Sequence, residues 1–124
     1  MSSMRLNLKR VHVQITTDAA GDATATLANI TGYLHAIAFV DTDTQTPDFT
    51  IARSTPAFTI LDDDGVTDTL FFVRYVNHDS SGNAGQSPLE RLLLIEETIT
   101  VTVENGGDTK NSDFYFYLSD LGSV

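Results

Sequence analysis

The chain has 124 residues, a length typical of one domain, and a formal net charge of −10. It has no cysteine, which excludes disulfides, thiolate metal sites and a cysteine nucleophile. The acid excess disfavours nucleic acid as a partner, because Lys and Arg must neutralise its phosphates. No apolar run approaches the roughly 20 residues that span a bilayer, and no signal-peptide-like segment follows the basic start. We therefore expect no membrane partner and synthesis in the cytoplasm.

The start of the chain is basic, unlike the rest. Arg5, Lys9 and Arg10 lie in the first ten residues, with no acid among them. This asymmetry predicts a basic N-terminal arm at residues 1–10, which could lie on an acidic neighbour, followed by a β-domain at residues 11–124. The neighbour could be another copy of the chain or a different protein. A basic edge strand with solvated charges would explain the same pattern.

In chain order, alternation of apolar and polar residues begins at residues 11–16, which predicts a half-buried strand. Residues 20–22 resemble a turn, and residues 22–31 a weaker strand of Ala and Thr, so we expect these two strands to form a hairpin. Gly32 breaks the pattern. Residues 33–40 are then more continuously apolar, which is typical of a central strand covered on both faces.

Shorter elements follow. Residues 49–53 and 58–61 are expected to be short strands, and residues 62–65 an Asp-Gly turn. Residues 69–76 form the most strand-like run in the chain. A loop rich in Ser, Gly and Asn follows at residues 77–88.

The last third of the chain closes the pattern. Residues 89–95 fit either irregular chain or a short strand leading into residues 97–104, where inward β-branched residues alternate with outward threonines. Residues 114–118 form a final strand. Seven or eight short strands with regular turn signals and no convincing helix predict an all-β, single-domain β-sandwich or jelly roll of antiparallel strands.

Some residue types used in catalysis occur without the required arrangement. His78, Asp79 and Ser80 are consecutive, whereas a hydrolytic triad needs side chains that converge from separate segments. We interpret them as a turn bonded to local backbone amides. Glu96 and Glu97 are adjacent at a strand start, so their side chains diverge, and such charges commonly guard strand ends against unwanted pairing.

Candidate metal ligands also lack the spacing that a metal site requires. Residues 62–64 with Asp68 could supply oxygen ligands for calcium, but they lack the alternating spacing of an EF-hand loop, which favours a solvated turn. His12, His35 and His78 lie on separate segments without ligand-motif spacing. We expect His35 to be a hydrogen-bonded core or interface histidine. The sequence therefore predicts no catalytic residue, metal site or cofactor, and a protein that is not an enzyme.

The aromatic strand near the end has two different faces. Phe114 and Phe116 should enter the core, which leaves Tyr115 and Tyr117 on the opposite face. Tyrosine suits a partly wet interface, because it supplies contact area and a hydroxyl at modest entropy cost. Tyrosines that simply line the sheet surface would give the same pattern.

A set of landmarks in this order resembles head decoration (cement) proteins of tailed phages, which are encoded near the major capsid gene. The landmarks are turns and strand edges at residues 16–25, 32–37, 48–51, 73–75, 78–82 and 103–110.

The resemblance implies a jelly-roll or β-sandwich protein on the outer head surface of the virion. It also implies that the protein bridges subunits of the major capsid protein, as a homo-oligomer that is commonly a trimer. Combined with the basic start, it predicts capsid or intersubunit contacts by Arg5, Leu6, Leu8, Lys9, Arg10, Val11, Tyr115 and Tyr117. Deleting residues 1–10 should then abolish head binding and leave the domain folded.

Two other functions stay open. A tail, neck or fibre-associated module could bind a host-surface glycan through the polar loops at residues 42–47 and 77–87, although the absence of Trp argues mildly against a sugar site. A metal-dependent jelly-roll enzyme of the cupin kind would need clustered His and carboxylate ligands, which the spacing does not supply.

Overall fold

The chain folds into antiparallel β-strands. The computed structural model describes residues 8–43, 45–55, 57–72 and 91–119, which contain seven strands and no helix. The strands run in the order β1-β7-β2-β6-β3-β4, and β5 also pairs with β2. This confirms the predicted all-β class and is consistent with a sandwich of seven or eight strands. The bounds are β1 (Leu8–Thr16), β2 (Ala23–Val40), β3 (Asp48–Ser54), β4 (Ala57–Asp63), β5 (Thr69–Phe72), β6 (Leu92–Glu104) and β7 (Asn111–Ser119).

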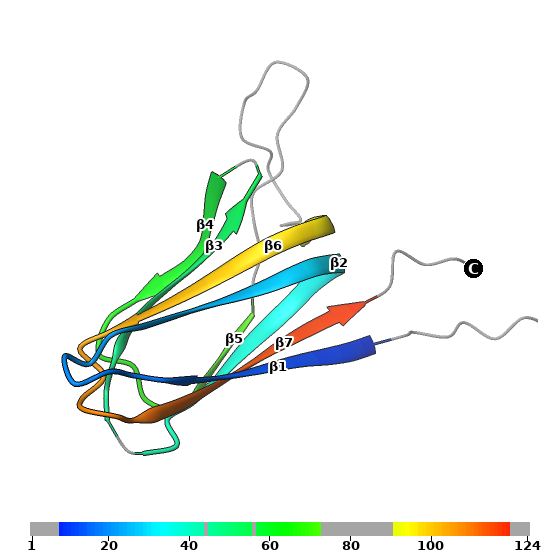
Figure 1. The fold of residues 1–124 in the computed structure, drawn as a ribbon. Coiled ribbons are helices and arrows are strands. Elements are labelled where there is room, and N and C mark those ends of the chain that lie inside the picture. The colour runs from blue at the N-terminus through cyan, green and yellow to red at the C-terminus, as the bar shows by residue number, and fades with distance from the viewer. Residues whose placement is uncertain (1–7, 44, 56, 73–90, 120–124) are drawn as a thin grey trace, which may run out of the picture.

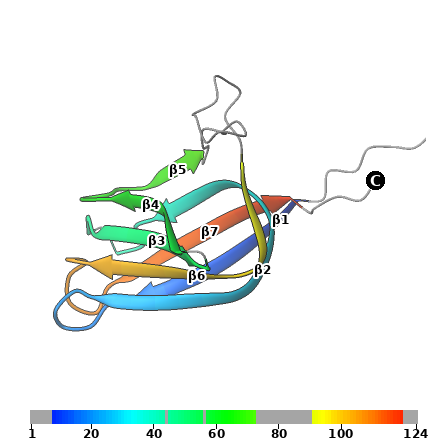
Figure 2. The same cartoon turned by 90° about the horizontal axis from the view of Figure 1, so that it is seen from above.

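The long strand β2 joins two layers of the sheet. Its first half pairs with β6, and its second half pairs with β7 on one side and β5 on the other. Figure 2 shows β2 curving round from one layer to the other. Layer one therefore consists of β1, β7, the second half of β2 and β5, and layer two of the first half of β2 with β6, β3 and β4 (Figure 1).

The bend in β2 corrects the prediction of two strands separated at Gly32. The register of β2 with β6 shifts twice between Leu27 and Gly32, and both Asn29 (φ 57°) and Gly32 (φ 142°) have positive φ. A Cβ on Gly32 would lie 2.5 Å from the carbonyl oxygen of Ser119. Bulges and glycines bend a strand without ending its pairing, so the glycine marks a turn between layers rather than a loop.

The predicted hairpin of residues 11–16 with residues 22–31 is wrong. β1 pairs along its whole length with β7, whereas the first half of β2 belongs to the other layer. The predicted turn does exist, and it docks on the turn before β7. Gly106 donates its N–H to the carbonyl of Gly21 at 2.9 Å, and the hydroxyl of Thr17 donates to the carbonyl of Gly107 at 2.6 Å. The turn therefore crosses between layers.

The core fills the space between the two layers. Three phenylalanines meet there, Phe39 from β2, Phe49 from β3 and Phe114 from β7, with ring centroids 5.1 to 5.3 Å apart. Such tilted and edge-to-face contacts are favourable for aromatic rings and hold the layers together. The buried cluster comprises Ile15, Ile30, Leu34, Ile37, Phe39, Phe49, Ile51, Ile60, Val66, Leu94, Ile99, Val101, Val103, Phe114, Phe116 and Leu118.

Two predicted segments have different bounds in the structure. β6 begins at Leu92, so from that residue onward the ambiguous segment 89–95 is part of the strand that was expected to start at residue 97. β5 covers Thr69–Phe72, and the remainder of the predicted strand at residues 69–76 lies outside the described residues, as does the predicted loop at residues 77–88.

Candidate functional site

The outward-pointing side chains of layer one form a continuous surface, called here the outer face. Alternation along β7 sends Phe114, Phe116 and Leu118 to the core and the residues between them outward. Strand register then places Arg10 opposite Tyr117, and His12 opposite Tyr115. The described members of the outer face are Leu8, Arg10, His12, Gln14, His35, Ala36, Ala38, Val40, Leu70, Phe72, Asp113, Tyr115, Tyr117 and Ser119.

The middle of the outer face is apolar. Ala36 pairs with Tyr117 on one side and Phe72 on the other, and Ala38 pairs with Tyr115 and Leu70 in the next row. Phe72 is 68% exposed and Leu70 is 49% exposed. Contiguous exposed apolar side chains beside tyrosines are typical of a surface that contacts another molecule.

A histidine and an arginine lie along the β1 side of this surface. The ring of His12 stacks on Tyr115 with centroids 4.5 Å apart and planes inclined by 12°. The guanidinium carbon of Arg10 lies 5.1 Å from the centroid of the same tyrosine ring. These contacts fix the orientation of Tyr115 and of the Arg10 charge, which reduces the entropy lost when a partner binds.

Asp113, near the start of β7, bonds side chains of β1 and of the chain after β2. This buried carboxylate accepts hydrogen bonds from Nε2 of His12 at 2.7 Å, from Gln14 at 3.3 Å and from the hydroxyl of Thr42. Desolvation by burial acts to raise the pKa of Asp113, but hydrogen bonds from Thr42 and His12 outweigh it and hold this pKa below its usual value. The cluster therefore keeps an ionised carboxylate in place beside His12 on the outer face.

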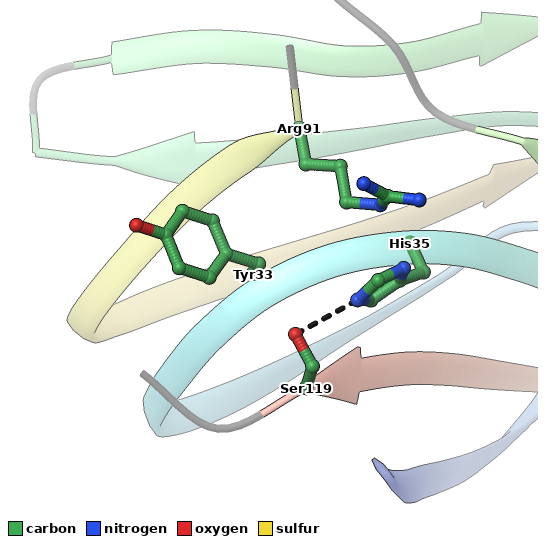
Figure 3. Close-up of a pocket in the computed structure, with 4 residues that line it drawn as sticks. All are labelled: Tyr33, His35, Arg91 and Ser119. Atoms are coloured by element: carbon green, nitrogen blue, oxygen red, sulfur yellow. Dashed lines mark hydrogen bonds between the residues drawn. The ribbon is translucent and has the colours of Figure 1, made fainter. Parts of the chain in front are cut away.

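A cavity of about 260 Å³ lies where β2, β6 and β7 meet, and it is lined by Tyr33, His35, Arg91 and Ser119. Nε2 of His35 and Oγ of Ser119 form a 2.8 Å hydrogen bond. Figure 3 shows Arg91 reaching over His35, while the hydroxyl of Tyr33 points away from the other three residues. The arrangement brings hydrogen-bond donors and one permanent positive charge to a single hollow.

The structure brings together only part of the predicted contact set. Leu8, Arg10, Tyr115 and Tyr117 share the outer face, because β1 and β7 pair in register. Val11 points the opposite way and packs against the core, and alternation places Lys9 on that side as well. Arg5 and Leu6 lie outside the described residues. Residues 8–10 of the predicted arm are part of β1.

Sequence reasoning missed the apolar half of the outer face. Leu70 and Phe72 alternate with Phe71, which packs against the core, so three consecutive apolar residues conceal which side is exposed. It also missed the register shift between Leu34 and Ala36, which places Ala36 as well as His35 on the outer face.

The other candidate ligand groups have local roles. Glu97 is buried and accepts hydrogen bonds from Ser54 and from the backbone N–H of Thr55, so it ties β6 to the β3–β4 turn instead of guarding a strand end. Asp63 caps its own turn by accepting the N–H of Asp64. Within the described ranges, no three His, Cys, Asp or Glu residues gather as a metal site. His78, Asp79 and Ser80 lie outside those ranges.

No family model, curated protein or solved structure matches this chain. The resemblance to phage head cement proteins therefore stays a prediction. In the part of the chain that the structure describes, no helix is long and apolar enough to cross a bilayer.

Proposed function

We propose that this protein is a virion structural protein that binds the outside of a phage head and stabilises it by bridging subunits of the major capsid protein. The observation that supports this proposal is the outer face, where exposed Leu70 and Phe72 share one surface with Tyr115 and Tyr117 on either side of β2. The order of turns and strand edges in the sequence supplies the link to phage heads.

The outer face has the composition of a contact surface. Aromatic residues and arginine are enriched at protein interfaces, and the outer face combines Tyr115, Tyr117 and Phe72 with Arg10. The residues are held on paired strands, so little order has to be gained on binding. Repeated over many copies on one head, moderate contacts of this kind would sum to durable attachment. A trimeric assembly follows from the resemblance alone.

A pair of matched substitutions tests the outer face. Phe72→Ser removes its most exposed aromatic side chain, and Phe58→Ser changes an exposed phenylalanine of β4 in layer two. Co-sedimentation with phage heads lacking the protein should show binding weakened about tenfold or more by Phe72→Ser, because a buried Phe contributes roughly 2 kcal/mol. Phe58→Ser should bind like the unchanged protein.

Equal binding by both variants would show that the outer face does not contact the phage head. Binding of the unchanged protein to host cells but not to heads would replace the proposal with a glycan-binding role in the tail, neck or fibre.

The predicted basic arm needs a shorter deletion than residues 1–10. Leu8 to Arg10 pair with Tyr117 to Ser119, so the longer deletion also removes part of β1. Deleting residues 1–7 keeps the whole strand. We expect this truncation to lose head binding while its circular dichroism spectrum and urea midpoint stay unchanged. Normal decoration of heads by the truncated protein would show that the arm is dispensable.

A further inference from the structure

We propose that the cavity lined by Tyr33, His35, Arg91 and Ser119 recognises a carboxylate of a partner protein, presented by an Asp or Glu side chain. This deepens the proposed function by naming the group that the partner supplies, and it rests on that function only for the identity of the partner. The binding chemistry belongs to the pocket itself.

The lining of the cavity matches an oxyanion. Arg91 offers a planar fork of N–H donors with a permanent positive charge, and the Ser119 hydroxyl can donate as well when it accepts the hydrogen bond from Nε2 of His35. The chain carries a net charge of −10, yet none of the described residues that line this cavity is acidic. A hollow that gathers donors on such an acidic protein is suited to an anion, with orientation set by the Arg91 fork.

Two backbone irregularities build this site. The register of β2 with β7 shifts between Leu34 and Ala36, so His35 and Ala36 both face outward between buried Leu34 and Ile37. Next to it, Gly32 lets β2 approach the carbonyl of Ser119, where a Cβ would lie 2.5 Å away. Bulges that re-aim one side chain are commonly found beside functional sites.

The surroundings favour a carboxylate over a free phosphate. One guanidinium balances the single charge of a carboxylate, whereas a phosphate dianion calls for further cations. The ring of Tyr33 forms a wall of the cavity, and its cross-strand partner Leu93 is 41% exposed. Ile95, two residues further along β6, is 59% exposed. An acidic side chain on a protein surface could place its carboxylate at Arg91 and its apolar neighbours on these residues.

The test uses the isolated full chain with acetate and inorganic phosphate as probes. NMR titrations of the Ser119 amide and His35 ring signals at pH 7 and 0.15 M salt should saturate with acetate, with half-saturation in the millimolar range. Phosphate should bind more weakly. Arg91→Gln should weaken acetate binding about tenfold, because it removes the charge and the two-pronged contact.

A control variant separates this site from general effects of charge. Arg53→Gln removes a cation in layer two that lies over the Phe58 ring. It should bind acetate like the unchanged chain.

Several outcomes would overturn the proposal. These are shifts that do not saturate, equal affinity in Arg91→Gln and the unchanged chain, or an equal loss in Arg53→Gln. Tighter binding of phosphate would overturn the assignment to a carboxylate. No phage head is needed for these titrations, so their failure leaves the head-binding proposal standing, and failed head binding leaves a positive titration intact.

Discussion

His12 donates a hydrogen bond from Nε2 to Oδ1 of Asp113 at 2.7 Å, joining residues 101 positions apart in the sequence. The bond crosses from β1 to β7, and the ring of the same histidine stacks on Tyr115. Thr42, which follows β2, donates to the other carboxylate oxygen. One buried carboxylate thus connects β1, β7 and the chain after β2, and it holds the β1 side of the outer face in position.

Replacing Asp113 should destabilise the fold. Asp113→Ala removes an acceptor that three side chains share, and hydrogen bonds to charged groups each contribute about 1.5–3 kcal/mol. Because His12 is partly exposed and can turn to water, we expect a loss of about 2 kcal/mol in the free energy of unfolding, measured by urea denaturation. Asp22→Ala, at an exposed turn position, should change it by less than about 0.5 kcal/mol. Equal effects would show that the cluster does not contribute.

Stability should fall in acid partly because of the same residue. The pKa of Asp113 lies below its ordinary value of 3.8, so its ionised form favours the folded state. The stability that it contributes is fully present above its unfolded pKa and is lost as the pH falls through the lower folded pKa. The pKa of Asp48 is also lowered, by hydrogen bonds from Asn105 and Gly65, whereas desolvation raises the pKa of Asp41 and opposes the trend.

Comparison with Asp113→Asn isolates this contribution from those of the other carboxyls. The difference in unfolding free energy between the two proteins should shrink as the pH falls below about pH 4. Urea denaturation at a series of pH values measures it. A difference that stays the same down to pH 3 would contradict the lowered pKa.

Substitution of Gly32 and of Gly65 by alanine should lower the free energy of unfolding by unequal amounts. Gly32→Ala places a methyl group 2.5 Å from the Ser119 carbonyl oxygen at a φ of 142°, so β2 and β7 must separate. We expect a loss of about 3 kcal/mol in unfolding free energy and a displaced His35–Ser119 hydrogen bond. Gly65→Ala also has positive φ, but its new methyl group has no atom within 4 Å, and it should cost about 1 kcal/mol. Similar losses would show that the close approach at Gly32 is relieved cheaply.

The sequence predicts well the features that depend on neighbouring residues. Alternation assigned Ile99, Val101 and Val103 to the core, and all three are buried. It also separated Phe114 and Phe116 from the two tyrosines between them. Side chains on a strand point to opposite faces in turn, so a few consecutive residues are enough to predict which side chains face the core.

Strand partners and bends could not be predicted in this way. Gly32 was interpreted as a break, but a glycine permits either a loop or a sharp bend, and only pairing with β6 and β7 distinguishes them. Strands that are adjacent in the sequence commonly pair, which favours a hairpin of β1 with the first half of β2. In the structure β1 pairs with β7 instead.

The same reasoning explains what was missed of the site. Tyr115 and Tyr117 were found from alternation, but their neighbours Ala36, Ala38 and Phe72 come from other strands, and only the register places them together. His35 turns outward at a bulge, which interrupts the alternation that the sequence displays.

The pairing of β1 with β7 also determines when this protein can complete its folding during translation. β1 leaves the ribosome about a hundred residues before its described partner β7, and the docked turns around Gly21 and Gly106 impose a similar delay. β1 must therefore wait as an unpaired, partly apolar segment until residues 111–119 have emerged. Its Lys and Arg residues carry like charges, and during that interval they would keep nascent chains on neighbouring ribosomes from associating.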